Sequence, residues 1–472
     1  MHGMRGEASL LITLIILLSL TPYHAEDRPN YIYTYYVSRD GYINVTIDFT
    51  GSGDGYSWLL VPRYEPWDIK IVRGNLQELE NKAVSVFYNN YSFYYSGDPA
   101  TFQISYLYRF GALIVEPNGA FFSTQITVSP RSTGSVFVVM PEDFKAKGSE
   151  PWWNKRWSQE GYTYYMYSLP PNEAGRILIS FEVEDKGDLV KIEGDGITVN
   201  TPRRYIDVAE NLTKIYSAVK REIERITHTT IEYAHVYFYV PMDMNEILEL
   251  GYTPFSQVSN KLGDIYINLI TVRMISGASE QAMLHEIIHH YLWKAGIDVS
   301  LLWVHEGLAN YLSTEILKAK GYPVENLTYE NLEEIPQITG DKYGFLEHWR
   351  VSSRPANIGL YYAASLYIIK TLGDQYGGLE LYSKLFMLIN KDKTILTTTD
   401  NFVDYLSQAA GVDLSQKFRK WGFTIGQPKI RNVGKAYLLY IIAGLIAVLL
   451  IVLIKEITRP TYYPGEEYYY IV

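Results

Sequence analysis

The chain has 472 residues, of which 47% are hydrophobic and 20% are charged. This length and composition are typical of a multidomain globular protein and exclude an intrinsically disordered one. The net charge of −10 argues against a nucleic-acid partner, and the absence of cysteine excludes disulfides, thiol nucleophiles and cysteine-based metal sites.

The N-terminal segment has the pattern of a secretory signal. An apolar run from Leu10 to Leu20 follows Arg5. A run of this length is too short to span a bilayer about 30 Å thick, but it suits the hydrophobic part of a signal peptide. We therefore expect residues 1–25 to be a signal peptide cleaved after Ala25, with an uncleaved N-terminal anchor as the alternative.

From residue 26 to residue 195, apolar and polar residues alternate at the period of a β-strand. Residues 31–37, 43–49 and 177–183 are examples, and glycine-rich or proline-containing turns separate such segments. Many short strands at regular spacing predict an N-terminal all-β domain, a sandwich or saddle.

Two features of the sequence concern the surface. Three tryptophans could form a sugar-binding platform, although an inter-domain packing cluster is the preferred interpretation: Trp152, Trp153 and Trp157. Four sequons are compatible with N-glycans on an external face, namely those of Asn44, Asn90, Asn211 and Asn326.

After residue 196 the period changes to that of a helix. Thr201-Pro202 has the pattern of an N-cap and a first-turn proline. Strands are expected at residues 234–240 and 264–270, and helical patterns then dominate to about Gly422. Residues 196–428 are therefore expected to form an α+β domain. Its first helix has one apolar face, formed by Val208, Leu212, Ile215, Val219, Ile223 and Ile226.

The chemistry of this domain is concentrated in His285-Glu286-Ile287-Ile288-His289, within a stretch that predicts a buried helix. Two imidazoles four residues apart lie on one helical face and can supply half of a tetrahedral Zn²⁺ site. Glu286, beside the first histidine, can take a proton from a water that zinc has acidified. The alternative is a helix whose histidines are merely packed or exposed.

A catalytic zinc site needs a third protein ligand and one open position. A second helix is predicted to begin near Trp303, and Glu306 on it is the preferred third ligand. His305 is the alternative, because adjacent residues on a helix diverge by about 100° and only one of the two can face the metal. Asn310, one turn later, could hydrogen-bond a ligand histidine or could be a solvated helix residue.

These motifs resemble those of the gluzincin metallopeptidases, on the aminopeptidase N and leukotriene-hydrolase branch. That branch carries HExxH and then a helix reading NEGFA, which residues 305–309 resemble, with His305 where the family usually has asparagine. The resemblance covers roughly residues 205–428. It implies a thermolysin-like metallopeptidase domain preceded by a β-rich domain, with zinc bound by His285, His289 and Glu306.

The resemblance also implies a tyrosine that stabilises the oxyanion of the reaction. In the family this tyrosine begins a helix, and residues 361–367 are similar to that helix start, so that Tyr361 aligns with it. Tyr362 is its rival, and in a chain with 43 tyrosines a plain packing role is a further alternative. Segments that resemble the end of the family's catalytic domain lie at residues 402–406, 411–414, 418–421 and 426–428.

Two departures from the family weaken the expectation of strict aminopeptidase specificity. The GxMEN stretch, whose glutamate holds the free amine of the substrate, is missing, and residues 259–268 stand in the place of this edge strand. An extended peptide could still pair with that strand, and Asp264 is more consistent with a turn than with an amine ligand. The family's large C-terminal helical domain is also missing.

Near the C-terminus, residues 436–454 are uncharged and apolar over the length of one transmembrane helix. Together with the signal peptide, this helix predicts a single-pass protein of the cell membrane, with the catalytic domain extracytoplasmic and residues 455–472 as a short cytoplasmic tail. The flanking lysines and arginines do not indicate the orientation, which therefore depends on the signal peptide.

The sequence thus predicts a membrane-anchored zinc metallopeptidase that hydrolyses peptide bonds in peptide or protein substrates. Zinc would polarise the scissile carbonyl group, Glu286 would activate water, and Tyr361 would support the oxyanion. A non-catalytic surface protein with a vestigial zinc site and a zinc hydrolase of a non-peptide bond are the alternatives.

Overall fold

The computed structural model describes residues 29–426, except for residues 64–68, 128–131, 170–173, 185–186, 188, 257–260 and 353–354. The predicted signal peptide (1–25), transmembrane helix (436–454) and tail (455–472) lie outside the described residues. None of the helices in the described part of the chain combines the length and apolar character that a membrane crossing requires.

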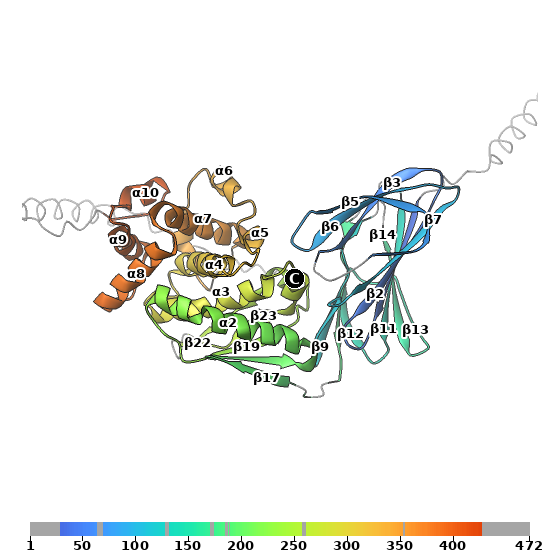
Figure 1. The fold of residues 1–472 in the computed structure, drawn as a ribbon, viewed down its shortest axis with the longest axis horizontal. Coiled ribbons are helices and arrows are strands. Elements are labelled where there is room, and N and C mark those ends of the chain that lie inside the picture. Colours follow the sequence, from blue (N-terminus) through green and yellow to red (C-terminus); the bar gives the residue numbers. More distant parts are fainter. Residues whose placement is uncertain are drawn as a thin grey trace, which may run out of the picture. The chain divides into compact units, whose positions relative to one another are not determined.

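The N-terminal region is built from β-strands, and its described residues contain no α-helix before Ile206 (Figure 1). Its largest sheet has seven strands in the order β13-β14-β11-β1-β2-β7-β4, in which β1 and β11 are parallel. Their bounds are β1 Asn30–Val37, β2 Ile43–Gly51, β4 Lys70–Gly74, β7 Ala100–Tyr108, β11 Thr133–Pro141, β13 Lys155–Gln159 and β14 Tyr162–Leu169.

Three smaller sheets complete this region. The first is a three-stranded sheet of β3 (Gly55–Pro62), β6 (Tyr88–Tyr95) and β5 (Leu76–Ala83). The second has four strands, β12 (Lys145–Glu150), β16 (Leu178–Glu182), β9 (Asn118–Phe122) and β8 (Ala112–Val115). The third pairs β10 (Ile126–Thr127) with β15 (Ala174–Gly175).

Tyrosine fills much of the β-rich core. In β1 the alternate residues Tyr31, Tyr33 and Tyr35 are buried, as the period-2 pattern predicts. The hydroxyl groups of two of them remain hydrogen-bonded, because Tyr31 meets the hydroxyl of Ser57 and Tyr35 meets that of Thr124 at 2.8 Å. These two tyrosine rings are therefore buried with their hydroxyl groups satisfied.

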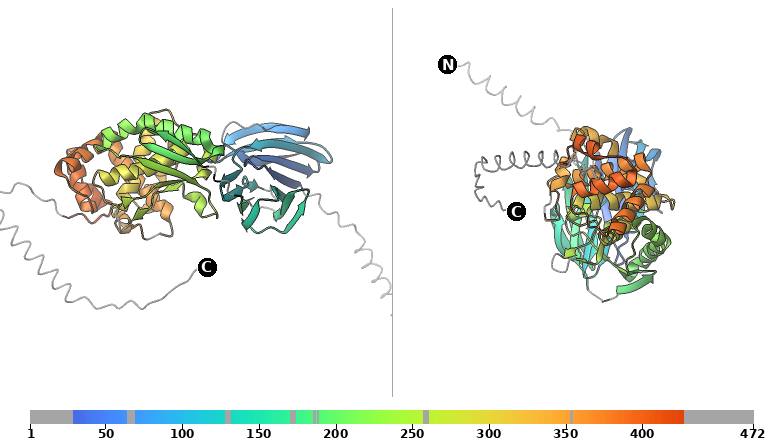
Figure 2. Two further views of the ribbon diagram at one scale, coloured as in Figure 1. Left: turned by 90° about the horizontal axis from the view of Figure 1, so that it is seen from below. Right: turned by 90° about the vertical axis from the view of Figure 1, so that its left-hand side faces the viewer.

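The following region combines a five-stranded sheet with helices (Figures 1 and 2, coloured green to red). The sheet has the order β17-β18-β19-β23-β20. Helices α2 and α3 pack on it, α2 against β17 and β18, and α3 against β23 and β20. The strands are β17 Leu189–Gly194, β18 Ile197–Pro202, β19 Ala234–Tyr239, β20 Gly251–Tyr252 and β23 Ile265–Asn268, and a separate pair consists of β21 Phe255–Ser256 and β22 Lys261–Leu262.

Helices make up the rest of this region. The two that carry the predicted zinc ligands are α3 (Ala278–Lys294) and α4 (Leu302–Lys318). The others are α2 Ile206–Thr227, α5 Glu325–Thr328, α6 Ile335–Thr339, α7 Ile358–Tyr376, α8 Leu379–Asp392, α9 Thr399–Ala410 and α10 Ser415–Lys420.

The predicted order of a β-rich region followed by a helical one is confirmed, but one predicted helix start is wrong. Thr201 and Pro202 end strand β18, where they pair with Val190 and Leu189, and α2 begins only at Ile206. The β17–β18 hairpin uses these residues for sheet pairing, so the helix starts after a 3₁₀ turn. The boundary at residue 195 remains a prediction.

Helices α4 and α7 meet at Gly307. A Cβ atom at this position would lie 2.8 Å from the carbonyl oxygen of Ser365 and 2.7 Å from Cγ1 of Ile369. Both distances are shorter than ordinary van der Waals contacts. The close approach of the two helices therefore requires the missing side chain of glycine directly after Glu306.

Candidate metal centre

Helix α3 is buried along most of its length. Almost every residue from Ala278 to Leu292 is buried, because the helix packs against strand β23, helix α2 and helix α4. The buried residues of α3 include polar and ionisable side chains as well as apolar ones. His285 and His289 therefore lie inside the protein, each with 9% of its surface exposed.

Four predicted residues come together at the contact of α3 and α4. The Nε2 atoms of His285 and His289 lie 3.1 Å apart, and Oε2 of Glu306 lies 3.1 Å and 3.7 Å from them respectively. Ligands at about 2.0–2.1 Å from a tetrahedral zinc are separated by about 3.3–3.4 Å. The three atoms thus have the spacing of one face of such a tetrahedron, and their donor types fit zinc.

Glu286 lies beside these three atoms. Its Oε1 is 4.0 Å from Nε2 of His285, farther than the oxygen of Glu306, and its Oε2 accepts a hydrogen bond of 3.0 Å from Thr253 Oγ1. The atoms that His285, Glu286 and His289 could offer to a metal all lie within 4.8 Å of one another. We regard Glu306 as the third ligand, since it is nearer to His285, and Glu286 as the neighbouring base.

Burial, opposed by His285 and helped by the nearby Glu306 carboxylate, raises the pKa of Glu286 to about 7. A carboxylate with a pKa near neutrality can both accept and return a proton at physiological pH. Glu286 therefore has the electrostatic setting of a general base.

His305 lies behind His289. Its Nδ1 is 3.4 Å from Nδ1 of His289, and its Nε2 is 2.8 Å from the carbonyl oxygen of Ile297. Burial lowers the pKa of His305, so its ring is neutral and carries one N–H. That N–H donates to Ile297, which leaves Nδ1 to accept from His289. His289 then presents an unprotonated Nε2 to the site, so His305 fits a supporting role and not that of third ligand.

We expect His305→Asn to weaken zinc binding about 10- to 100-fold, the usual cost of losing a group that orients a metal ligand. Competition with a chelator of known affinity would measure this loss in the purified protein. His235→Asn, at an exposed position on strand β19, is the control and should leave the affinity unchanged. Equal affinities for the two variants would contradict the orienting role of His305.

Proton competition should make zinc binding pH-dependent. Burial alone lowers the pKa of His285, but hydrogen bonds that its ring donates to Glu306 and Asn310, together with the nearby carboxylates, outweigh it and raise the pKa above 6.5. Below that pKa, zinc must displace a proton from His285. The affinity should therefore fall by up to about tenfold between pH 6.5 and pH 5.5. Zinc dissociation constants across this range would test the expectation, and a flat profile would contradict it.

The structure places Tyr361 on α7, apart from these contacts. Its ring packs edge-on against Phe345 at 4.8 Å and Trp349 at 5.5 Å between ring centroids. Tyr362 also contacts Trp349 and is 37% exposed. The described contacts thus bring Glu286 and the three ligand atoms together, but they do not join either tyrosine to them.

Two elements near Glu286 had no signal in the sequence analysis. Thr253 follows strand β20, the two-residue edge strand that pairs with β23. A Cβ at Gly251 would lie 3.2 Å from Cγ of Glu286, so strand β20 lies directly against the side chain of Glu286. The expected edge strand at residues 259–268 is therefore wrong, because its second half forms β23, which has neighbours on both sides.

Comparisons with known proteins give a distant structural likeness. No protein-family model matches the chain, and no curated protein matches it. Among solved structures, the chain is similar to leukotriene A4 hydrolase of yeast. Native yeast LTA4 hydrolase is 14% identical, with 85% of this chain and 68% of that chain covered and a TM-score of 0.33.

Two further structures of that enzyme give the same result. The native enzyme of Saccharomyces cerevisiae is 14% identical, covers 88% of this chain and 72% of its own, and has a TM-score of 0.34. The complex of yeast LTA4 hydrolase with bestatin is 13% identical, with a TM-score of 0.33. The match covers 89% of this chain and 72% of that chain.

The segment that follows α8 supports the start of α4. The indole N–H of Trp303 donates to Thr399 Oγ1 at 3.1 Å, and its ring contacts Phe402, Phe418 and Phe423. Because Trp303 precedes Glu306 by one turn, this aromatic packing helps to fix the position of the third ligand.

Proposed function

We propose that the chain is a membrane-anchored, extracytoplasmic zinc metallopeptidase. The observation that carries the proposal is the set of three ligand atoms spaced as a tetrahedral face, with a buried glutamate beside it. Two histidines, a carboxylate and an adjacent carboxylate base are the groups that zinc-dependent hydrolysis requires.

Each side chain has a separate task in this reaction. Bound zinc would polarise the carbonyl group of the substrate and lower the pKa of the attacking water. Glu286 takes a proton from that water and returns it to the leaving amine, while Thr253 holds its second oxygen. His305 fixes the tautomer of His289. In the proposal, Tyr361 or Tyr362 donates to the oxyanion as the substrate binds.

A peptide substrate could pair with the free edge of β20. Within the described part of the chain, Gly251 and Tyr252 pair with β23 alone, and they lead directly to Thr253 and the base. An extended peptide adds to such an edge through main-chain hydrogen bonds. The edge strand therefore favours a peptide bond as the one that is cut.

Zinc content and peptide hydrolysis by the purified full-length protein test this function. Peptides with free and with acetylated N-termini should be compared, because cleavage of only the free form would indicate an aminopeptidase. We expect about one zinc per chain and hydrolysis that a chelator abolishes. Bound zinc with no hydrolysis of either peptide form would overturn the peptidase assignment.

A further inference from the structure

On one face of the seven-stranded sheet, a row of aligned side chains that includes three aromatic rings crosses six strands. Strand pairing places six residues directly opposite one another on β13, β14, β11, β1, β2 and β7. Several of them are exposed, including Tyr36 at 47% and Leu107 at 56%. In strand order the row is Trp157, Tyr164, Val139, Tyr36, Asn44 and Leu107.

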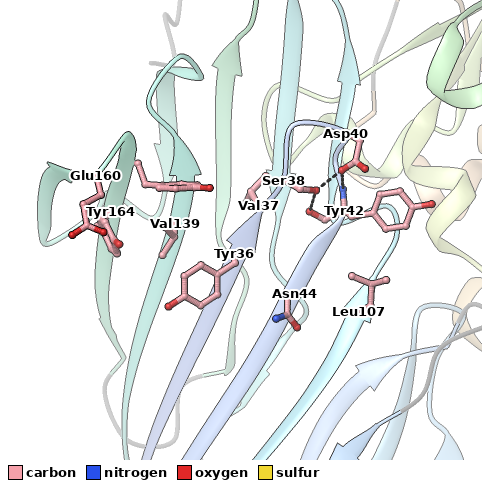
Figure 3. Close-up of a pocket in the computed structure, with 11 residues that line it drawn as sticks. Tyr36, Val37, Ser38, Asp40, Tyr42, Asn44, Leu107, Val139, Glu160 and Tyr164 are labelled. Atoms are coloured by element: carbon pink, nitrogen blue, oxygen red, sulfur yellow. Dashed lines mark hydrogen bonds between the residues drawn. The ribbon is translucent and has the colours of Figure 1, made fainter.

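A hollow of about 740 Å³ lies over this row (Figure 3). The described residues that line it include the carboxylates of Asp40 and Glu160 but no lysine or arginine, so an anionic ligand is disfavoured. The central strands pair on both sides, which leaves no backbone groups for an added peptide strand. Ring faces combined with hydrogen-bond acceptors suit a neutral sugar, which has an apolar C–H face and hydroxyl donors.

Asn44 itself lies in this hollow and begins the sequon Asn44-Val45-Thr46. Ser105 Oγ donates to Asn44 Oδ1 at 3.1 Å, which fixes the amide. Figure 3 shows the amide nitrogen on the side of Tyr36. The atom that would be glycosylated therefore faces the aromatic part of the row.

Two of the other three sequons are in different settings. The amide nitrogen of Asn211 donates to Glu280, a buried carboxylate on α3. The Oδ1 atom of Asn90 is buried. Asn326, on helix α5, is exposed but has no comparable aromatic surroundings among the described contacts. Among the described residues, Asn44 is the sequon asparagine that lines the hollow over the aromatic row.

We propose that Asn44 carries an N-linked glycan whose first sugars lie along the row from Tyr36 to Tyr164. Tyr164 is three strands from Asn44, about 14 Å, which is within the reach of a short oligosaccharide. The Asn44 amide nitrogen displaces a lipid phosphate from the anomeric carbon of a lipid-linked saccharide. The phosphate leaves with the bonding electrons, and the amide loses one proton. The inference rests on the extracytoplasmic placement in the proposed function.

Mass spectrometry of glycopeptides from the protein purified from its own cells tests the modification. We expect Asn44 to be occupied and Asn211 to be unmodified. A glycan at Asn326 without one at Asn44 would overturn this inference alone. Unmodified asparagine at all four sequons would overturn the inference, whereas zinc content and hydrolysis, which test the proposed function, would be unaffected.

Thermal unfolding of the same protein tests the seating of the glycan. Thr46→Ala removes the sequon and should lower Tm by about 2–4 °C, whereas Asn326→Gln should not change it. Tyr36→Ser should then destabilise the glycosylated protein more than the Thr46→Ala protein. An equal effect of Tyr36→Ser in both backgrounds would show that the glycan does not contact the row and would overturn the seating.

Discussion

Glu286→Gln is expected to lower kcat/KM for peptide hydrolysis by about 10³-fold or more while zinc remains bound. Glutamine keeps the size of the side chain and can still contact Thr253, but it cannot accept a proton from water. General base catalysis by a positioned carboxylate contributes about 10²–10⁴ in rate. Steady-state kinetics and zinc analysis on the same preparation would measure both quantities.

The matched control is Glu280→Gln, on the same helix. Glu280 is also buried, burial also raises its pKa, and it bonds to Asn211 instead of lying beside the ligand atoms. This variant should keep both hydrolysis and zinc. If Glu286→Gln retained more than a tenth of the wild-type activity, Glu286 would not be the general base.

Glu306→Gln should cost more than about 100-fold in zinc affinity, and the activity should fall with the zinc content. The loss of a group behind a ligand already costs about 10- to 100-fold, so the loss of a charged ligand oxygen should exceed it. Glu306 Oε2 is the atom of α4 that reaches both imidazoles, at 3.1 Å and 3.7 Å. Chelator competition gives the affinity, and circular dichroism shows whether the helices persist.

Glu315→Gln provides the corresponding control on α4. Glu315 accepts a hydrogen bond from the Tyr329 hydroxyl at 2.8 Å, away from the histidines, so its replacement should leave zinc binding unchanged. Normal zinc content in the Glu306 variant would show that the third ligand is a different group and would remove the basis of the proposed centre.

The shared direction of the two histidines in the HExxH segment could be predicted, because it depends only on the repeat of the α-helix. Residues four apart on any helix share a face, so His285 and His289 had to point the same way. Glu306 comes from another helix, and its meeting with them depends on long-range packing. The sequence indicated it through a resemblance, and the distances of 3.1 Å and 3.7 Å agree with that expectation.

Other features of the site have no local sequence pattern. Strand β20 has two residues, too few for any alternation of polar and apolar side chains, so Thr253 beside the base gave no signal. The supporting role of His305 depends on the carbonyl oxygen of Ile297, which belongs to the loop between α3 and α4. At Thr201-Pro202 the helix-start pattern was overridden by pairing with β17.

For Tyr361, the match between motifs predicts the position in the chain but not the direction of the side chain. Its place at the start of a helix agrees with the resemblance, since α7 begins at Ile358. The direction of its hydroxyl depends on Phe345 and Trp349, which lie in an irregular segment before the helix. The role of Tyr361 in catalysis therefore remains a proposal.

Gly307, on α4, relates the candidate metal centre to the distance between helices α4 and α7. Gly307 is bonded to Glu306, and the backbone of Ser365 occupies the space that a side chain would need. A larger residue here would push α4 away from α7 and so shift Glu306 relative to the two imidazoles on α3. The packing of α7 against α4 therefore helps to set where the proposed third ligand lies, although α7 itself contributes no ligand atom to the centre.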